Sequence, residues 1–135
     1  MEVRTAANLI LATVLLGSPA RLFAHHSLSA EFDLTKPVRL VGTVTNVEWI
    51  NPHARVFVEV KDGGGQVTSW ECQLFSPQVL MRRGWTRDSL KPGDRVTVKG
   101  NPARDGSPRV HALSVKTRGR HKVFAGSSAA EKAEQ

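Results

Sequence analysis

Cysteine is nearly absent from this chain of 135 residues, in which Cys72 is the only one. A single thiol excludes an intrachain disulfide, so the packing of the core must stabilise the fold. In the alternating pattern around it, Cys72 shares one side with Trp70 and Leu74. We therefore expect Cys72 to be a small buried side chain.

Motifs of the common enzyme classes are also missing. The sequence has no nucleophile elbow, no phosphate-binding glycine loop, no zinc-type cysteine spacing and no helical histidine pair. The triple glycine at 63–65 is too short to cradle a phosphate, and no spacing pairs two of the carboxylates of Glu48, Glu59, Glu71 and Asp94. These absences favour a non-catalytic module over an enzyme.

The chain has one apolar run of note, and it is too short to span a bilayer as a stable helix. The run, Leu9–Leu16, follows Arg4 and is ended by Gly17-Ser18-Pro19. This pattern is typical of a secretory signal peptide, and it lacks the amphipathic stripe that a buried helix would show. We expect residues 1–24 to be removed after Ala24. The mature chain, with no second apolar run, is then predicted to be periplasmic or secreted without a transmembrane segment.

Acidic residues are scarce in the second half. Residues 82–122 carry twelve Lys and Arg against three Asp and Glu, whereas residues 25–81 carry four against six, within a net charge of +7. The basic set includes Arg82, Arg83, Arg87, Lys91, Arg95 and Lys99. In an exported protein such a set is either a solvated face or attracts anionic lipid or envelope polymers. Export also makes nucleic acid an unlikely partner.

The stretch from Val38 to His53 is the segment with which the later strands are expected to pair. Its β-branched residues predict a strand over 38–49, and we expect a bulge near Gly42 to exchange its two faces. Asn51-Pro52 then predicts a turn that presents His53. Ahead of this strand, residues 25–37 read as an arm that docks through Phe32.

Four further strands are predicted at 54–61, 66–74, 95–100 and 109–117, with a short helix that begins at Ser76 and ends at Gly84. In the last strand we expect Val110 and Ala112 on one side and Leu113 and Val115 on the other. Three strands, a helix and two strands predict an all-β, five-stranded barrel of the oligonucleotide/oligosaccharide-binding (OB) type over 38–125, with a small sandwich as the competitor. Residues 126–135 are predicted to be a disordered tail.

Histidines supply the first candidate site. Removal of residues 1–24 would leave His25 with a free α-amine beside its imidazole, a pair that chelates Cu(II). His53 can complete a three-nitrogen site if the arm folds back, and processing one residue earlier would place His26 third in a copper-chelating terminus. The alternative is a polar flank at the cleavage site and a histidine that caps a turn. We expect His111 and His121, which lie among basic residues, to be surface side chains.

Aromatic residues supply the second candidate site. Trp49, Phe57 and Trp70, with Asn51 at the corner, are predicted to line a ligand-binding face on the second and third strands, where such barrels stack sugars or bases. Phe57 is the best candidate because it alternates away from Val56 and Val58. The competing interpretation places the tryptophans in the core.

Several motifs together resemble one family. They are Ala24-His25-His26-Ser27, Glu31-Phe32-Asp33, Val47-Glu48-Trp49 with Asn51-Pro52-His53, Ser76-Pro77, Arg-Arg-Gly-Trp-Thr-Arg at 82–87, Leu-Lys-Pro-Gly-Asp at 90–94 and Lys-Val-Phe-Ala-Gly-Ser-Ser at 122–128. The chain is similar to small exported bacterial proteins catalogued as a domain of unknown function. The resemblance implies a single exported domain and supplies no activity. Arg55 and Cys72 depart from it, because relatives tend to carry an aromatic residue there.

We therefore expect an exported β-barrel module that binds a small ligand, with copper at His25, His26 and His53 as the sharpest form of this hypothesis. The alternative is an interaction module that holds an anionic envelope component or a partner protein through its basic second half.

Overall fold

The computed structural model describes residues 27–117, so the predicted signal peptide, His25, His26, His121 and the predicted tail lie outside it. Its elements are α1 Leu28–Glu31, β1 Val38–Glu48, β2 Arg55–Lys61, β3 Val67–Gln73, α2 Pro77–Arg82, β4 Arg95–Pro102 and β5 Arg109–Thr117. This is the predicted order, with a short helix added in the arm. No helix between residues 27 and 117 has the length and apolar character needed to cross a membrane.

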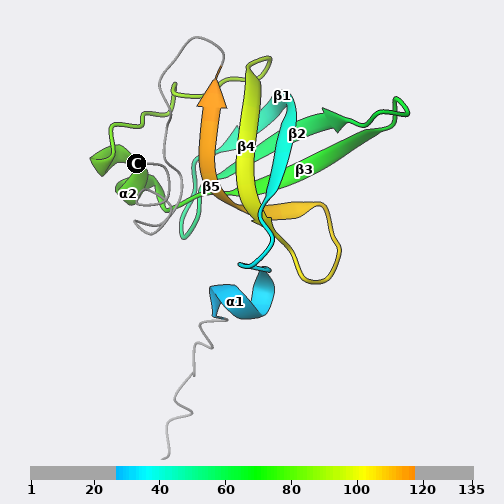
Figure 1. Cartoon of the computed structure of the whole chain (residues 1–135). Helices are drawn as coiled ribbons and strands as arrows, with labels where there is room; N and C mark the ends of the chain where they lie inside the picture. The colour runs from blue at the N-terminus through cyan, green and yellow to red at the C-terminus, as the bar shows by residue number, and fades with distance from the viewer. Residues whose placement is uncertain (1–26, 118–135) are drawn as a thin grey trace, which may run out of the picture.

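The strands close into a barrel in the order β1-β2-β3-β5-β4 (Figure 1). Neighbouring strands are antiparallel except β3 and β5, which run parallel over a short register that includes Gln73 opposite His111. A closed five-stranded barrel with a helix between β3 and β4 is the OB architecture. The predicted fold class is therefore confirmed.

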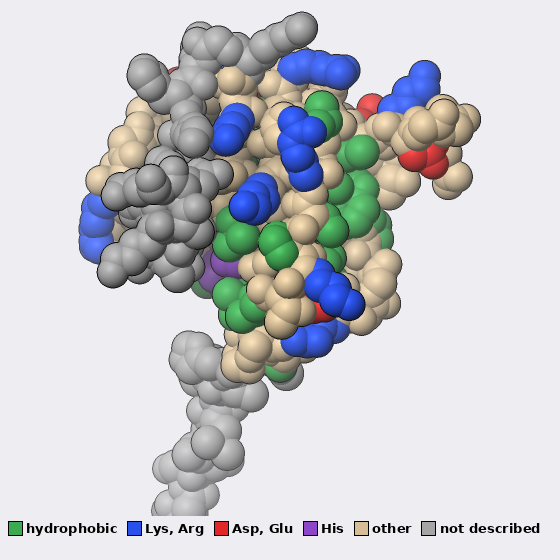
Figure 2. Space-filling model, in the orientation of Figure 1, with side chains coloured by type: hydrophobic (Ala, Val, Ile, Leu, Met, Phe, Trp, Pro, Cys, Tyr) green, Lys and Arg blue, Asp and Glu red, His purple; other side chains and the backbone are tan. Residues whose placement is uncertain are grey.

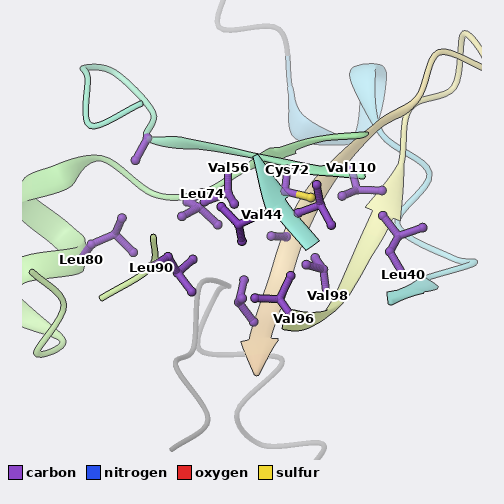
Figure 3. Packing of buried hydrophobic residues seen from close by; sticks show 14 of the residues in the cluster. Leu40, Val44, Val56, Cys72, Leu74, Leu80, Leu90, Val96, Val98 and Val110 are labelled. Carbon is purple, nitrogen blue, oxygen red and sulfur yellow. The ribbon is translucent and has the colours of Figure 1, made fainter. Parts of the chain in front are cut away.

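β-branched residues fill the barrel because alternate positions of each strand point inward. Val44, Val56, Val58 and Val98 are almost completely buried and converge with Leu74 in one cluster (Figure 3). Cys72 belongs to this cluster, and its burial raises the pKa of the thiol to about 12. The expectation of a buried cysteine is confirmed.

The bulge in β1 lies further along the chain than predicted. The register with β2 shifts between Val44 and Asn46 rather than near Gly42. The faces exchange only after Val44, so Val41 remains on the outside and is 40% exposed. Gly42 serves a different need, because a Cβ atom there would overlap the carbonyl oxygen of Glu59.

A second bulge, which the sequence pattern does not reveal, sits where β4 meets β5. Lys99 pairs with Ser114 but Gly100 pairs with Ala112, so Leu113 is an extra residue. Val110, Ala112 and Val115 therefore all face the core. The prediction that Val115 lies on the opposite side of the strand from Val110 and Ala112 is wrong. The strands approach closely at this point, because a Cβ atom on Gly100 would lie 2.7 Å from the carbonyl oxygen of His111.

Candidate functional site

The corner after β1 holds His53 in a defined orientation. Ala54 donates its N–H to the carbonyl of Phe75, and Leu74 donates its N–H to the carbonyl of Ala54, which ties the corner to the segment after β3. Nδ1 of His53 lies 3.1 Å from the carbonyl oxygen of Leu74. Because a carbonyl only accepts, Nδ1 carries the proton, and in the neutral imidazole Nε2 is the nitrogen with the lone pair. A histidine held in this way is prepared to act as a metal ligand through Nε2.

His111 does not lie at the surface as predicted. Only 4% of its surface is exposed, and its ring lies against Phe32 at 5.8 Å and Phe75 at 6.3 Å between centroids. The prediction is wrong because the arm covers the outer side of β5. The alternation of residues along a single strand does not reveal that another segment covers it. Figure 2 shows histidine atoms in a recess between hydrophobic side chains, above the position of α1.

Two buried polar atoms where β4 and β5 pair under the arm have no hydrogen-bond partner among residues 27–117. They are Nδ1 of His111 and Oδ1 of Asn101, which is buried and pairs with His111 across β4 and β5. A buried polar atom without a partner costs about 1–3 kcal/mol, so such atoms call for an explanation. Both atoms therefore have unused hydrogen-bonding capacity.

The surroundings of His111 favour the neutral form of its imidazole. Burial lowers its pKa below 6.5, and the charge of nearby His53 lowers it further, while Glu31 opposes both. A neutral imidazole retains the lone pair that a metal ion needs. The sequence offered no signal for this residue beyond the histidine itself.

The arm is fixed to the barrel next to these histidines. Phe32 is fully buried and forms a β-bridge with Ala103, which confirms that the arm docks through Phe32. Nη1 of Arg109 donates to the carboxylate of Glu31 at 2.8 Å, and this hydrogen bond raises the pKa of Arg109. The guanidinium also lies 5.8 Å from the ring centre of Phe32. Arg109 thus clamps the arm over the outer side of β5.

The chain between His26 and the docked Phe32 is short. His26 precedes Phe32 by six positions, and four of the residues between them form α1. Because a helix rises only about 1.5 Å per residue, the separation is less than the roughly 20 Å that six extended residues would span. His25 and His26 themselves lie outside the described residues. Between residues 27 and 117 no three His, Cys, Asp or Glu side chains come together as a metal site, so His53 and His111 supply only part of a ligand set there.

The three predicted aromatic residues do not share one side of the sheet. Trp70 pairs with Val58, whose side chain is in the core, and both Trp70 and Trp49 pack against the core cluster. Phe57 precedes Val58 and therefore points to the opposite, outer side. Asn51 is exposed at the turn. Both tryptophans are half-buried at the margin of the core cluster.

The predicted basic set is divided between two places. Arg82 and Arg83 lie at the end of α2, where the guanidinium of Arg83 stands 4.9 Å from the ring centre of Phe75. Lys91 forms an exposed ion pair with Asp88 at 3.6 Å. Arg95 and Lys99 instead lie on β4.

A family model described as a family of unknown function (DUF6152) matches residues 13–112. Among solved structures, the chain is similar to the mitochondrial single-stranded DNA-binding protein Rim1 of S. cerevisiae, with 15% identity, a TM-score of 0.47 and coverage of 61% of this chain and 93% of that one. It is also similar to a small single-stranded DNA-binding protein from Streptomyces coelicolor, with 18% identity, a TM-score of 0.42 and coverage of 64% and 95%. No curated protein matches it.

Proposed function

The chain belongs to the DUF6152 family of unknown function, and we propose that it is an exported, non-catalytic barrel that binds one Cu(II) ion where the arm meets the barrel. The ligands are nitrogen atoms of the processed N-terminus, from His25 or His26, together with Nε2 of His53. The neutral imidazole of His111 is a further nitrogen donor beside His53.

The observation that carries this proposal is the fixed orientation of His53 next to a second, buried histidine. Its Nδ1–H bond to the carbonyl of Leu74 sets the tautomer, as the outer hydrogen bonds of metal-bound histidines commonly do. The docked arm supports the proposal, because Phe32 lies against His111 and only five residues separate Phe32 from His26. Export is supported by the composition of residues 1–24.

Copper is the metal that this donor set favours. An α-amine and imidazoles are nitrogen ligands, which suit Cu(II) in a tetragonal arrangement, and Cu(II) binds most tightly of the divalent first-row metals. The only cysteine is buried within the barrel, so thiolate ligation of the kind that selects Cu(I) or zinc clusters is not available.

The first test uses protein secreted and processed by its native route. Mass spectrometry identifies its first residue and any bound metal, and calorimetry with electron spin resonance measures Cu(II) uptake. We expect one tightly bound Cu(II) with nitrogen hyperfine coupling. Absence of Cu(II) uptake by the processed protein would contradict the proposal.

Variants then test the ligands. Loss of a ligand costs more than loss of a second-shell partner, so His53→Ala is expected to weaken Cu(II) binding at least about tenfold. His121→Ala is the matched control, because it removes a histidine outside the proposed set, and it should leave the affinity unchanged. Equal affinities for both variants would exclude His53 from the site.

A second candidate function is an interaction module that binds an anionic envelope component or partner protein through the basic second half. It is favoured by Arg95 and Lys99, which take part in no ion pair within the described part of the chain. Binding that weakens steeply as salt is added would support this function, and binding indifferent to salt would reject it.

A further inference from the structure

The outer side of β1, β4 and β5 beyond the arm carries a cluster of cations that we name the basic face. Its members are Arg39, Arg95, Lys99 and Lys116, with Val41 among them. Arg39 lies directly opposite Lys99, Val41 opposite Thr97, and Thr97 opposite Lys116. Directly opposed residues point to the same side of a sheet, so these side chains share one surface.

The cations of the basic face have no internal counter-charge. None of the four forms an ion pair within residues 27–117, whereas Arg55 pairs with Glu48 and Glu71 on the neighbouring strands. Like charges directly opposite each other destabilise a sheet, and Arg39 and Lys99 are such a pair. Glu59 is an acidic residue of the adjoining strand β2; it lies opposite Thr43 and lines a second hollow with Val41 and Arg95, but it forms no ion pair with the basic face.

The basic face is also hollowed at its centre. A hollow of about 330 Å³ is lined by Val41, Arg95, Val96, Thr97, Lys116 and Thr117. The guanidinium of Arg95, the ammonium group of Lys116 and the hydroxyl of Thr97 lie on the outer side with the exposed Val41. This combination suits a phosphate ester with an apolar neighbour.

We propose that the basic face docks on a membrane that contains anionic phospholipid, with a lipid phosphate in the hollow between Arg95 and Lys116. Val41, which is 40% exposed, then contacts the interfacial region of the bilayer. Figure 2 shows Lys and Arg side chains standing over this face with hydrophobic side chains beside them.

A membrane fits this surface better than a nucleic acid does. The strand positions that form the basic face hold Arg, Lys, Val and Thr and no aromatic residue on which a base could stack. The cations are instead spread over three adjacent strands of an open face, which suits a planar array of negative headgroups. This inference rests on the second candidate function and is independent of the copper site.

The test is co-sedimentation of metal-free protein with vesicles of phosphatidylcholine, alone or with a third phosphatidylglycerol. We expect binding only when phosphatidylglycerol is present. Each Lys or Arg near an anionic surface contributes about fivefold to the affinity, so Arg39→Gln with Lys99→Gln should weaken binding about 25-fold. The control is the double variant Arg82→Gln with Arg87→Gln. It removes the same amount of charge at α2 and just after it, away from the basic face, and should leave binding unchanged.

Three results would overturn the inference: no binding to phosphatidylglycerol vesicles, equal loss in both double variants, or an oligonucleotide bound through Arg39 by a protein that ignores vesicles. The second would show that net charge alone acts. Val41→Ser should weaken vesicle binding without changing the net charge. Thermal unfolding confirms that each variant folds, and Cu(II) binding by the Arg39/Lys99 double variant, measured separately, should be unchanged.

Discussion

One side of β4 and β5 is divided into two halves that differ in almost every physical property. Under the arm, Asn101 and His111 are buried, uncharged and short of hydrogen-bond partners. Beyond the arm, Lys99 and Lys116 are charged. Lys99 is exposed to solvent and Lys116 is half-buried. Since both halves come from the same pair of strands, the covering by Phe32 rather than the strand itself decides the character of each.

The bulge at Leu113 separates the halves. Without the extra residue, simple alternation from Lys116 would place Ala112 outside and His111 in the core. The bulge reverses this, so His111 emerges on the outer side where the arm can cover it. A single irregularity of the backbone thus permits a buried histidine outside the barrel core.

Phe32→Ala is expected to have the largest effect on the difference between the two halves, because it removes the side chain that covers His111. Replacing a fully buried phenylalanine costs about 3–5 kcal/mol, and here the loss should release the arm and expose His111. Chemical denaturation and proteolysis ahead of Val38 measure the two effects. Leu34→Ala, at a side chain that is 43% exposed, is the control and should change neither. An arm that stays protected in Phe32→Ala would show that other contacts hold it.

Gly100→Ala should have the next largest effect, since it lies at the boundary between the halves. Its added Cβ would meet the backbone oxygen of His111 at 2.7 Å, so one strand must shift. We expect a loss of about 1–3 kcal/mol in the free energy of unfolding. Gly63→Ala, where no atom lies within 4 Å, is the matched control and should be close to neutral. Equal effects at both positions would mean that the close approach is not needed.

The pH dependence of stability is a further test of the difference between the buried half and the open half. The pKa of His111 is lowered by burial and by His53, so the unfolded chain binds its proton more tightly than the folded one. The stabilisation is complete above pH 6.5, the ordinary value, and is lost progressively as the pH falls below it. The lowered pKa values of Asp33 and Asp105 act only in more acidic solution, below 3.8.

Denaturant midpoints of metal-free protein from above pH 6.5 down to about pH 5 measure this dependence. His111→Leu removes the titrating group and should flatten the curve, whereas Lys116→Gln, in the open half, should leave its slope unchanged. A wild-type curve already flat over this range would show that His111 is not kept neutral by the fold.

The sequence was sufficient for the fold because its signals are local. Alternating valines, the Asp62–Gly65 turn and the Ser76 cap each specify one element, and their order suffices to indicate the barrel. Cys72 and Phe32 were also predicted, since apolar residues seek the interior whatever covers them.

The candidate site was only partly predictable because it depends on contacts between distant segments. His53 was identified from its corner, but its orientation comes from Leu74, 21 positions away. His111 was missed because two non-local features place it, the bulge at Leu113 and the cover of Phe32. Charge counting likewise located a basic half but not the basic face, whose Arg39 comes from the acidic half of the sequence.

The smallest expected effect lies in the open half and has the opposite sign. Lys99→Gln relieves the repulsion from Arg39 and should raise the free energy of unfolding by about 0.5 kcal/mol, within the range of opposed pairs in sheets. Thermal unfolding at low salt measures the gain, which should vanish at high salt because ions screen exposed charges. Arg82→Gln, which has no opposed cation in a strand, should show no gain. If Lys99→Gln instead destabilises the protein, Lys99 has a structural role. A gain in stability together with weaker vesicle binding would indicate that the cations of the open half are retained for binding at the expense of the fold.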